Sequence, residues 1–184
     1  MFESVLKNKD NLIYNLPEGS EALALAELAS KSQKGAIHIS KNDVFAEKII
    51  KIIEFFYPEI EIIYLPAWDT NPYDLTSPHN EITSQRLNSL AALKDGLAQN
   101  KIVVTTASSV LQRNIPKEII SKSSIEIKKG DIIDRAELQR FLVDNSYINV
   151  AAASDHGEFA VRGSIIDIFP SSCDYGLRLD FFDN

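Results

Sequence analysis

The chain has 184 residues, 45% of them hydrophobic and 24% charged, which is the composition of an ordinary globular protein rather than a disordered or fibrous one. Its net charge is −7, with 19 Lys and Arg residues against 26 Asp and Glu residues. Proteins that bind nucleic acids on their own usually carry a basic face, because contacts to phosphates supply most of the affinity. The charge therefore argues against an autonomous DNA-binding protein.

The compartment is predicted from the cysteine count and the hydrophobic runs. Cys173 is the only cysteine, which excludes an intramolecular disulfide and a cysteine metal cluster and fits a reducing cytoplasm. The start of the chain lacks a signal-peptide pattern, and a run of about 18 apolar residues, the length of a membrane helix, occurs nowhere. We expect a cytoplasmic protein without membrane contact.

Residues 1–116 alternate short apolar runs with longer stretches of helical period, a pattern that predicts a parallel sheet covered by helices. The expected strands are residues 12–15, 36–40, 59–65 and 101–106. The expected helices are residues 21–33 with Ser20 as N-cap, 43–56, a helix that begins at Ser77-Pro78, and 107–112. In the helix 43–56 the spacing predicts burial of Phe45, Ile49, Ile52 and Phe56.

Residues 117–184 change in character and predict a small α+β domain with antiparallel strands. Residues 125–128 alternate apolar and polar side chains, as a half-buried strand does, and Gly130 marks a turn. A helix is expected at residues 134–144, followed by strands at residues 147–152, 159–169 and 177–182. The expected fold class is therefore α/β, with a separate α+β domain after the parallel sheet.

Residues 16–21 stand where a phosphate-binding loop would lie, but they include one Gly, two carboxylates and no Lys. Carboxylates there would repel a polyphosphate, and the missing Lys removes the charge clamp, so we expect no nucleotide cofactor and no hydrolysis. His38, His79 and His156 lie in separate predicted elements without the spacing of metal ligands, so no metal site is predicted. No pattern points to catalytic residues.

Two questions stay open at this point. In the loop 66–74, Trp68 and Tyr73 either anchor the loop onto the sheet or form an aromatic contact surface. Open α/β sheets usually hold ligands at the ends of their strands, so a small α/β nucleotide- or ligand-binding enzyme is the alternative to a protein that docks other proteins.

The last two predicted strands form a hairpin with a distinctive face. If Phe169 lies opposite Leu177 and Ser164 opposite Phe182, odd-numbered residues face the core. The even-numbered face then carries Arg162, Ser164, Arg178, Asp180 and Phe182, together with Ile166 and Ile168. An aromatic beside two arginines has the composition of an interface hot spot. The alternative is a solvated sheet face on which Arg178 pairs with a nearby carboxylate.

Three segments carry a family resemblance. They are residues 65–74 (LPAWDTNPYD) followed by Ser77-Pro78-His79, residues 157–170 (GEFAVRGSIIDIFP), and residues 177–183 (LRLDFFD). Together they resemble the UvrB-like module at the start of bacterial transcription-repair coupling factors. The resemblance implies a helicase-like domain 1a with a P-loop NTPase-type fold at residues 1–116. It also implies a domain 2 at residues 117–184, and that the chain stops inside or just after it.

The resemblance also implies a function. In that family the whole protein is an ATP-driven DNA translocase that displaces stalled RNA polymerase and recruits the excision-repair protein UvrA. Its contacts with DNA and RNA polymerase lie in other parts of the full-length protein, so the resemblance implies that this chain docks UvrA and is not itself an enzyme. The partner-binding positions that match are Arg162, Arg178 and Phe182. The family lacks the phosphate loop of UvrB, in agreement with residues 16–21.

Overall fold

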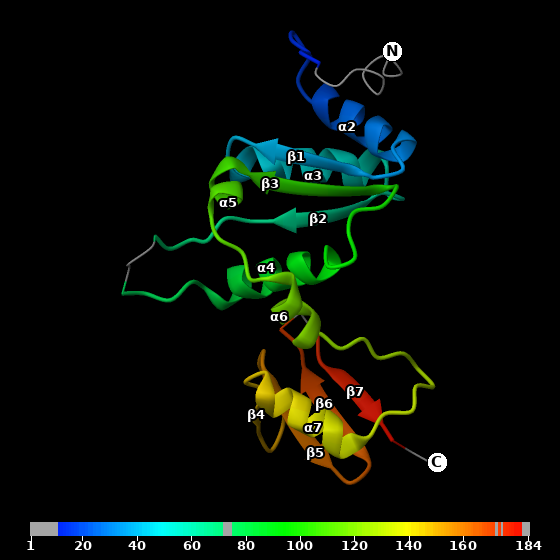
Figure 1. Ribbon diagram of the computed structural model, residues 1–184, viewed down its shortest axis with the longest axis vertical. Coiled ribbons are helices and arrows are strands. Elements are labelled where there is room, and N and C mark those ends of the chain that lie inside the picture. Colours follow the sequence, from blue (N-terminus) through cyan, green and yellow to red (C-terminus); the bar gives the residue numbers. More distant parts are fainter. Residues whose placement is uncertain (1–10, 72–74, 172, 174, 182–184) are drawn as a thin grey trace. The chain divides into compact units, whose positions relative to one another are not determined.

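A computed structural model describes residues 11–71, 75–171, 173 and 175–181 of the chain. The chain divides into two compact units, Met1–Ser121 and Lys122–Asn184, and helix α6 (Lys117–Lys122) lies at the division. Figure 1 shows helices around a small sheet in the first unit and a helix beside a second sheet in the other. Helices combined with a parallel sheet confirm the predicted α/β class.

The first unit is built on a parallel sheet with the strand order β1-β3-β2. Its strands are β1 (Ala36–Ser40), β2 (Glu61–Leu65) and the central β3 (Lys101–Thr106). All residues of β3 after Lys101 are buried, as expected of a parallel strand covered on both faces. The predicted strands at residues 36–40 and 101–106 are confirmed, and the one at 59–65 is confirmed two residues shorter.

Helices cover both faces of this sheet (Figure 1). Helices α2 (Ser20–Lys31) and α3 (Asp43–Phe56) pack together against one face, where Ala26, Ile53 and Val104 belong to one buried cluster. Helix α4 (Asn80–Ala92) packs on strand β2, and the short helix α5 (Ala107–Leu111) follows β3. Burial of apolar side chains between these layers provides the main driving force for folding.

Three predicted details of the first unit are wrong. Residues 12–15 form no strand. Ser20 is not the N-cap of α2, because Gly19 takes that position with a left-handed φ of 85° and the Ser20 hydroxyl donates to the carbonyl of Pro17. Helix α4 begins at Asn80 with His79 as N-cap, two residues later than the Ser77-Pro78 signal indicated.

Gly35, after α2, is required by its surroundings. Its φ is 67°, and a Cβ atom at this position would lie 2.5 Å from the carbonyl oxygens of Ala98 and Lys101. Both observations exclude a larger residue, since L-residues rarely adopt this φ and the backbone oxygens cannot move freely. The glycine therefore permits the tight turn that joins α2 to β1.

Helix α3 confirms the predicted bounds but not the predicted buried face. Ile49 and Ile53 are buried, whereas Phe45 is 42% and Phe56 is 59% exposed, and Ile52 is only partly buried. The helix is apolar around much of its circumference, so several faces satisfy a helical period. The sheet and α2 select the face that carries Ala46, Ile49 and Ile53.

The second unit has a four-stranded sheet with the order β4-β5-β6-β7 and one helix, α7 (Arg135–Asp144), on one of its faces. The short strand β4 (Ile148–Asn149) runs parallel to β5, and the other pairs are antiparallel. The predicted helix is confirmed, with the side chain of Asp134 as its N-cap. The predicted strand at residues 125–128 is wrong, although Ile127 packs against the core from an irregular segment.

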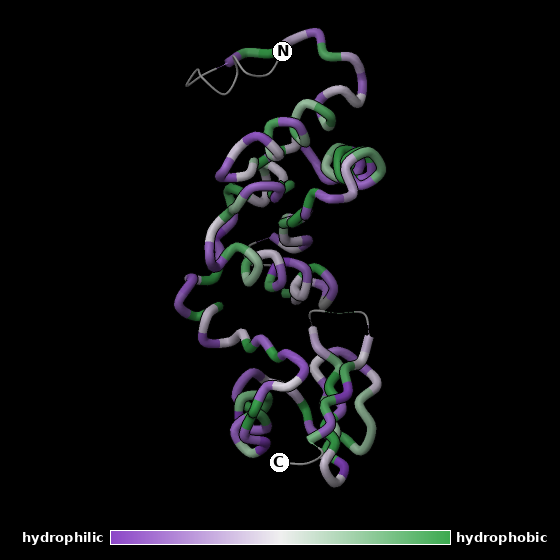
Figure 2. Tube along the Cα trace, turned by 90° about the vertical axis from the view of Figure 1, so that its right-hand side faces the viewer, coloured by the Kyte–Doolittle hydropathy of each residue, from purple (hydrophilic) through white to green (hydrophobic). Residues whose placement is uncertain are grey.

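Hydrophobic and hydrophilic residues alternate along much of the chain, as expected for amphipathic helices and for strands with one buried face (Figure 2). Within the described residues, no helix is both long and apolar enough to cross a membrane.

The buried face of α3 predicts a large loss of stability for one truncation and a small one for another. Ile53→Ala removes a fully buried side chain and is expected to lower the free energy of unfolding by about 2–5 kcal/mol. Phe56→Ala removes an exposed side chain, and its effect is expected to stay within about 0.5 kcal/mol. Denaturant titration of both variants measures the difference, and a larger loss for Phe56→Ala than for Ile53→Ala would contradict the packing described here.

Candidate docking surface

The predicted single strand 159–169 is two strands joined by a tight turn. Strand β5 (Glu158–Arg162) and strand β6 (Ile165–Phe169) pair antiparallel, so that Arg162 lies opposite Ile165. Gly163 stands in the turn with a left-handed φ of 57°, which glycine adopts at little cost. The third strand, β7 (Leu177–Asp180), pairs with β6.

This turn changes which residues face the core. Ile166 and Ile168 are buried in the core beside Phe159, whereas the prediction placed both isoleucines on the solvent face. The predicted register is also wrong by one residue, because Ile168 rather than Phe169 lies opposite Leu177. The prediction assumed one continuous strand, in which odd-numbered residues face the core along the whole length. In the hairpin, odd-numbered residues of β5 but even-numbered residues of β6 face the core.

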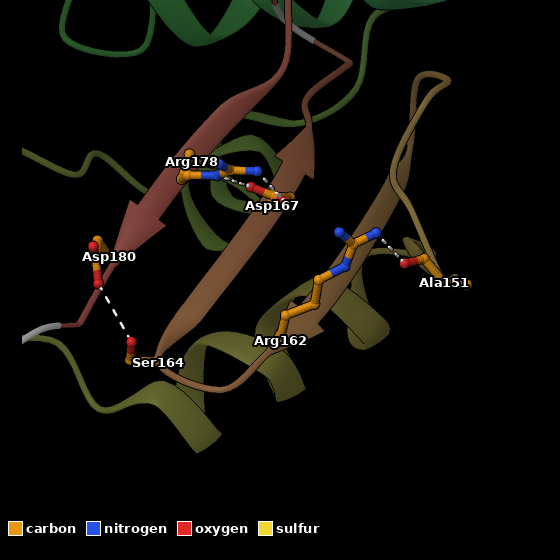
Figure 3. Close-up of polar contacts among 6 residues, drawn as sticks. All are labelled: Ala151, Arg162, Ser164, Asp167, Arg178 and Asp180. Carbon is orange, nitrogen blue, oxygen red and sulfur yellow. Dashed lines mark hydrogen bonds and ion pairs between the residues drawn. The ribbon is translucent and has the colours of Figure 1, made fainter.

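The outer face of this sheet, which we call the docking face, carries Arg162, Asp167, Arg178 and Asp180 (Figure 3). Strand register places Asp167 directly opposite Arg178. The structure therefore brings the two predicted arginines onto one face. The third predicted residue, Phe182, lies outside the described residues.

Asp167 and Arg178 form a bidentate ion pair. Nε of Arg178 donates to Oδ1 of Asp167 over 2.6 Å, and its Nη2 donates to Oδ2 over 3.0 Å. The hydrogen bonds from Arg178 hold the pKa of Asp167 below its ordinary value, and the charge of Arg162 acts in the same direction. The pairing of Arg178 with a nearby carboxylate, which the sequence left as an alternative, is thus present.

Arg162 is held by the backbone instead. Its Nη2 donates to the carbonyl oxygen of Ala151 over 2.7 Å, from the segment that follows β4. On the same face, the hydroxyl of Ser164 lies 3.5 Å from a carboxylate oxygen of Asp180. Sequence reasoning did not identify Asp167 or Ala151. An acidic residue between the apolar Ile166 and Ile168 was the available signal for Asp167.

A carboxylate of the loop before α2 forms an ion pair with a lysine. Lys48 on α3 donates to Glu18, and this contact lowers the pKa of Glu18. The backbone at Gly19 leads directly into the helix. The residue before the N-cap of α2 is thus a carboxylate paired with a lysine, whereas in nucleotide-binding folds phosphates bind at the helix N-terminus.

His38, on β1, has two polar neighbours. Its Nε2 lies 2.9 Å from the hydroxyl of Ser40, and its Nδ1 lies 3.8 Å from a carboxylate oxygen of Glu21. Burial lowers the pKa of His38, and Glu21 partly offsets this. Ser40 is only 4% exposed, which leaves its hydroxyl closed to a substrate. Across the described parts of the chain, no three His, Cys, Asp or Glu side chains group into a metal site.

Trp68 anchors the loop that follows β2. Its backbone N–H donates to the side chain of Gln112 over 2.8 Å, and its ring lies 4.5 Å from the guanidinium carbon of Arg86. Arg86 is buried and donates to the carbonyl of Pro66, to the Ser109 hydroxyl and to Asn114. The anchoring interpretation of Trp68 fits these contacts. Tyr73 lies outside the described residues.

The docking face lies within a segment that matches a known domain family. Residues 125–184 match the model of the UvrB interaction domain. The transcription-repair-coupling factor of Haemophilus influenzae is 33% identical over 179 residues, which is 96% of this chain, and that of Rickettsia bellii is 37% identical over 82% of it. The UvrABC system protein B of Vibrio parahaemolyticus is 25% identical over 89% of the chain. The chain spans 15%, 13% and 26% of these three relatives, respectively.

The ion pair on the docking face predicts a measurable titration. Because the folded pKa of Asp167 is depressed, the contribution of the pair to stability is complete above the ordinary pKa of an aspartate and is lost as the pH falls through the lower, folded value. In Arg178→Ala the titration midpoint of Asp167, followed by carboxyl NMR, is expected to rise. An unchanged midpoint would mean that the pair does not form in solution.

Proposed function

This chain is a UvrB-like module related to the transcription-repair-coupling factors, and we propose that it recruits the excision-repair protein UvrA through its docking face. The observation that carries the proposal is the pair of arginines on one exposed sheet face within the segment that matches the UvrB interaction domain. A recruiting role of this kind belongs in the cytoplasm, where bacterial DNA is repaired.

The chemistry of the face suits a protein partner. Arginine presents a planar fork of N–H donors that matches a carboxylate, and arginine and aromatic residues are enriched among the residues that dominate binding energy. In the proposed complex Arg162 and Arg178 meet acidic groups of UvrA, while Phe182 fills an apolar pocket. Residues 1–116 then correspond to domain 1a and residues 117–184 to domain 2 of the UvrB-like module.

We propose neither catalysis nor a cofactor for this chain. The Glu18 and Lys48 pair before α2 replaces the glycine-rich backbone and free lysine that a phosphate loop needs. ATP-driven translocation on DNA and displacement of stalled RNA polymerase are proposed for the full-length protein, through parts other than these residues. The alternative of a small α/β enzyme lacks a supporting observation.

Substitutions on the docking face are expected to weaken UvrA binding and to leave the fold intact. Arg162→Ala and Phe182→Ala should each cost about 2 kcal/mol or more of binding free energy, as residues at the centre of an interface do. Calorimetric titration with purified UvrA measures the loss, and thermal unfolding checks the fold. Undiminished binding by the double variant Arg162→Ala/Phe182→Ala would contradict the proposal.

Magnesium-ATP is expected not to bind this chain with useful affinity, because Glu18 and Glu21 lie where a phosphate loop requires Gly and Lys. Calorimetric titration with magnesium-ATP tests this, and Lys48→Ala, which leaves Glu18 unpaired, should not create binding. A dissociation constant of about 1 μM or lower would instead support the nucleotide-binding alternative.

A further inference from the structure

Asp167 lies on the docking face, and neither the core nor the proposed contacts explain its place there. It stands on the inner strand β6, between Arg178 of β7 and Arg162 of β5 (Figure 3). Its side chain is 20% exposed, whereas that of Arg178 is 65% exposed. The carboxylate therefore lies at the base of the face, and the guanidinium extends outward from it.

The ion pair uses only part of the arginine fork. A guanidinium has five N–H donors, and Asp167 accepts one from Nε and one from Nη2. Both bonds engage one edge of the fork, so the donors of Nη1 remain. Among the described residues, Nη1 has no hydrogen-bond partner. Arg178 can therefore keep its bond to Asp167 and still present donors to an acidic group of a partner.

Such a pair lowers the entropic cost of binding. A free arginine on a strand samples many rotamers, and fixing it on association costs free energy. The two bonds to Asp167 fix the guanidinium before the partner arrives. The charge of Arg162 also lowers the pKa of Asp167, so the Asp167 carboxylate offsets part of the positive charge on the face.

We propose that Asp167 is a positioning residue of the docking face: its carboxylate holds Arg178 in the orientation that meets an acidic group of the partner. This inference rests on the proposed function. The opposite role is physically possible, because a carboxylate that pairs with Arg178 could instead compete with the partner for it. The two roles predict opposite changes in affinity when the carboxylate is removed.

The test is calorimetric titration of purified UvrA with Asp167→Asn, which removes the charge at nearly constant volume. We expect binding to weaken by about threefold to tenfold, the effect of leaving one arginine side chain unfixed. Asp144→Asn is the control, since it removes the same charge from an exposed position at the end of α7, which packs on the opposite face of the sheet. Thermal unfolding of each variant checks the fold, and Asp167→Glu, which keeps the charge, is the second variant if Asp167→Asn unfolds.

A double-mutant cycle separates positioning from a general effect on the sheet. In the Arg178→Ala background, Asp167→Asn is expected to change binding no further, because the residue it positions is gone. Tighter binding by Asp167→Asn, an equal loss in Asp144→Asn, or an additive loss in the double variant would each overturn the inference. If Asp167→Asn binds like wild type while Arg162→Ala/Phe182→Ala does not bind, only the positioning role fails. If wild type does not bind UvrA, the proposed function and this inference fail together.

Discussion

The reversal of the chain at Gly163 decides both the core and the outer face of the second unit. Because the turn changes the parity of the strand, Phe159 of β5 and Ile166 of β6 point into the same core. The same change places Asp167 on the outer face, directly opposite Arg178. A continuous strand would have exposed Ile166 and Ile168 and turned Ile165 and Phe169 toward the core instead. One turn thus determines the packing and the charge pattern on which the proposed docking depends.

The features predicted correctly from the sequence were those with strong local signals. The β-branched run of β3 and the helices α3 and α7 all appear where residue type and periodicity placed them. The failures came from choices that only tertiary contacts make. Phe56 satisfies a helical period as well as Ile53 does, yet the sheet covers only the face that carries Ile53.

The candidate site was predicted in composition but not in geometry. The prediction placed Arg162 and Arg178 on one face correctly, although two of its assumptions were wrong. The turn between β5 and β6 moves the odd-numbered residues of β6 to the outer face, and the one-residue shift in the register of β6 and β7 returns the even-numbered residues of β7 to that same face. Asp167 had a sequence signal, but its pairing with Arg178 and the bond of Arg162 to the carbonyl of Ala151 depend on strand pairing, which the sequence pattern did not fix. The same holds for Arg86, whose buried contacts join Pro66, Ser109 and Asn114 across the first unit.

Protection of individual arginines against an arginine-specific reagent tests the docking account most directly. The chain is labelled with phenylglyoxal, with and without saturating UvrA, and modification at each arginine is measured by mass spectrometry. Arg113 and Arg140 are exposed and lie outside the docking face, so they report on general shielding. The account predicts that UvrA protects Arg162 and Arg178 and leaves Arg113 and Arg140 reactive. Protection of Arg113 or Arg140 with Arg162 and Arg178 still reactive would contradict it.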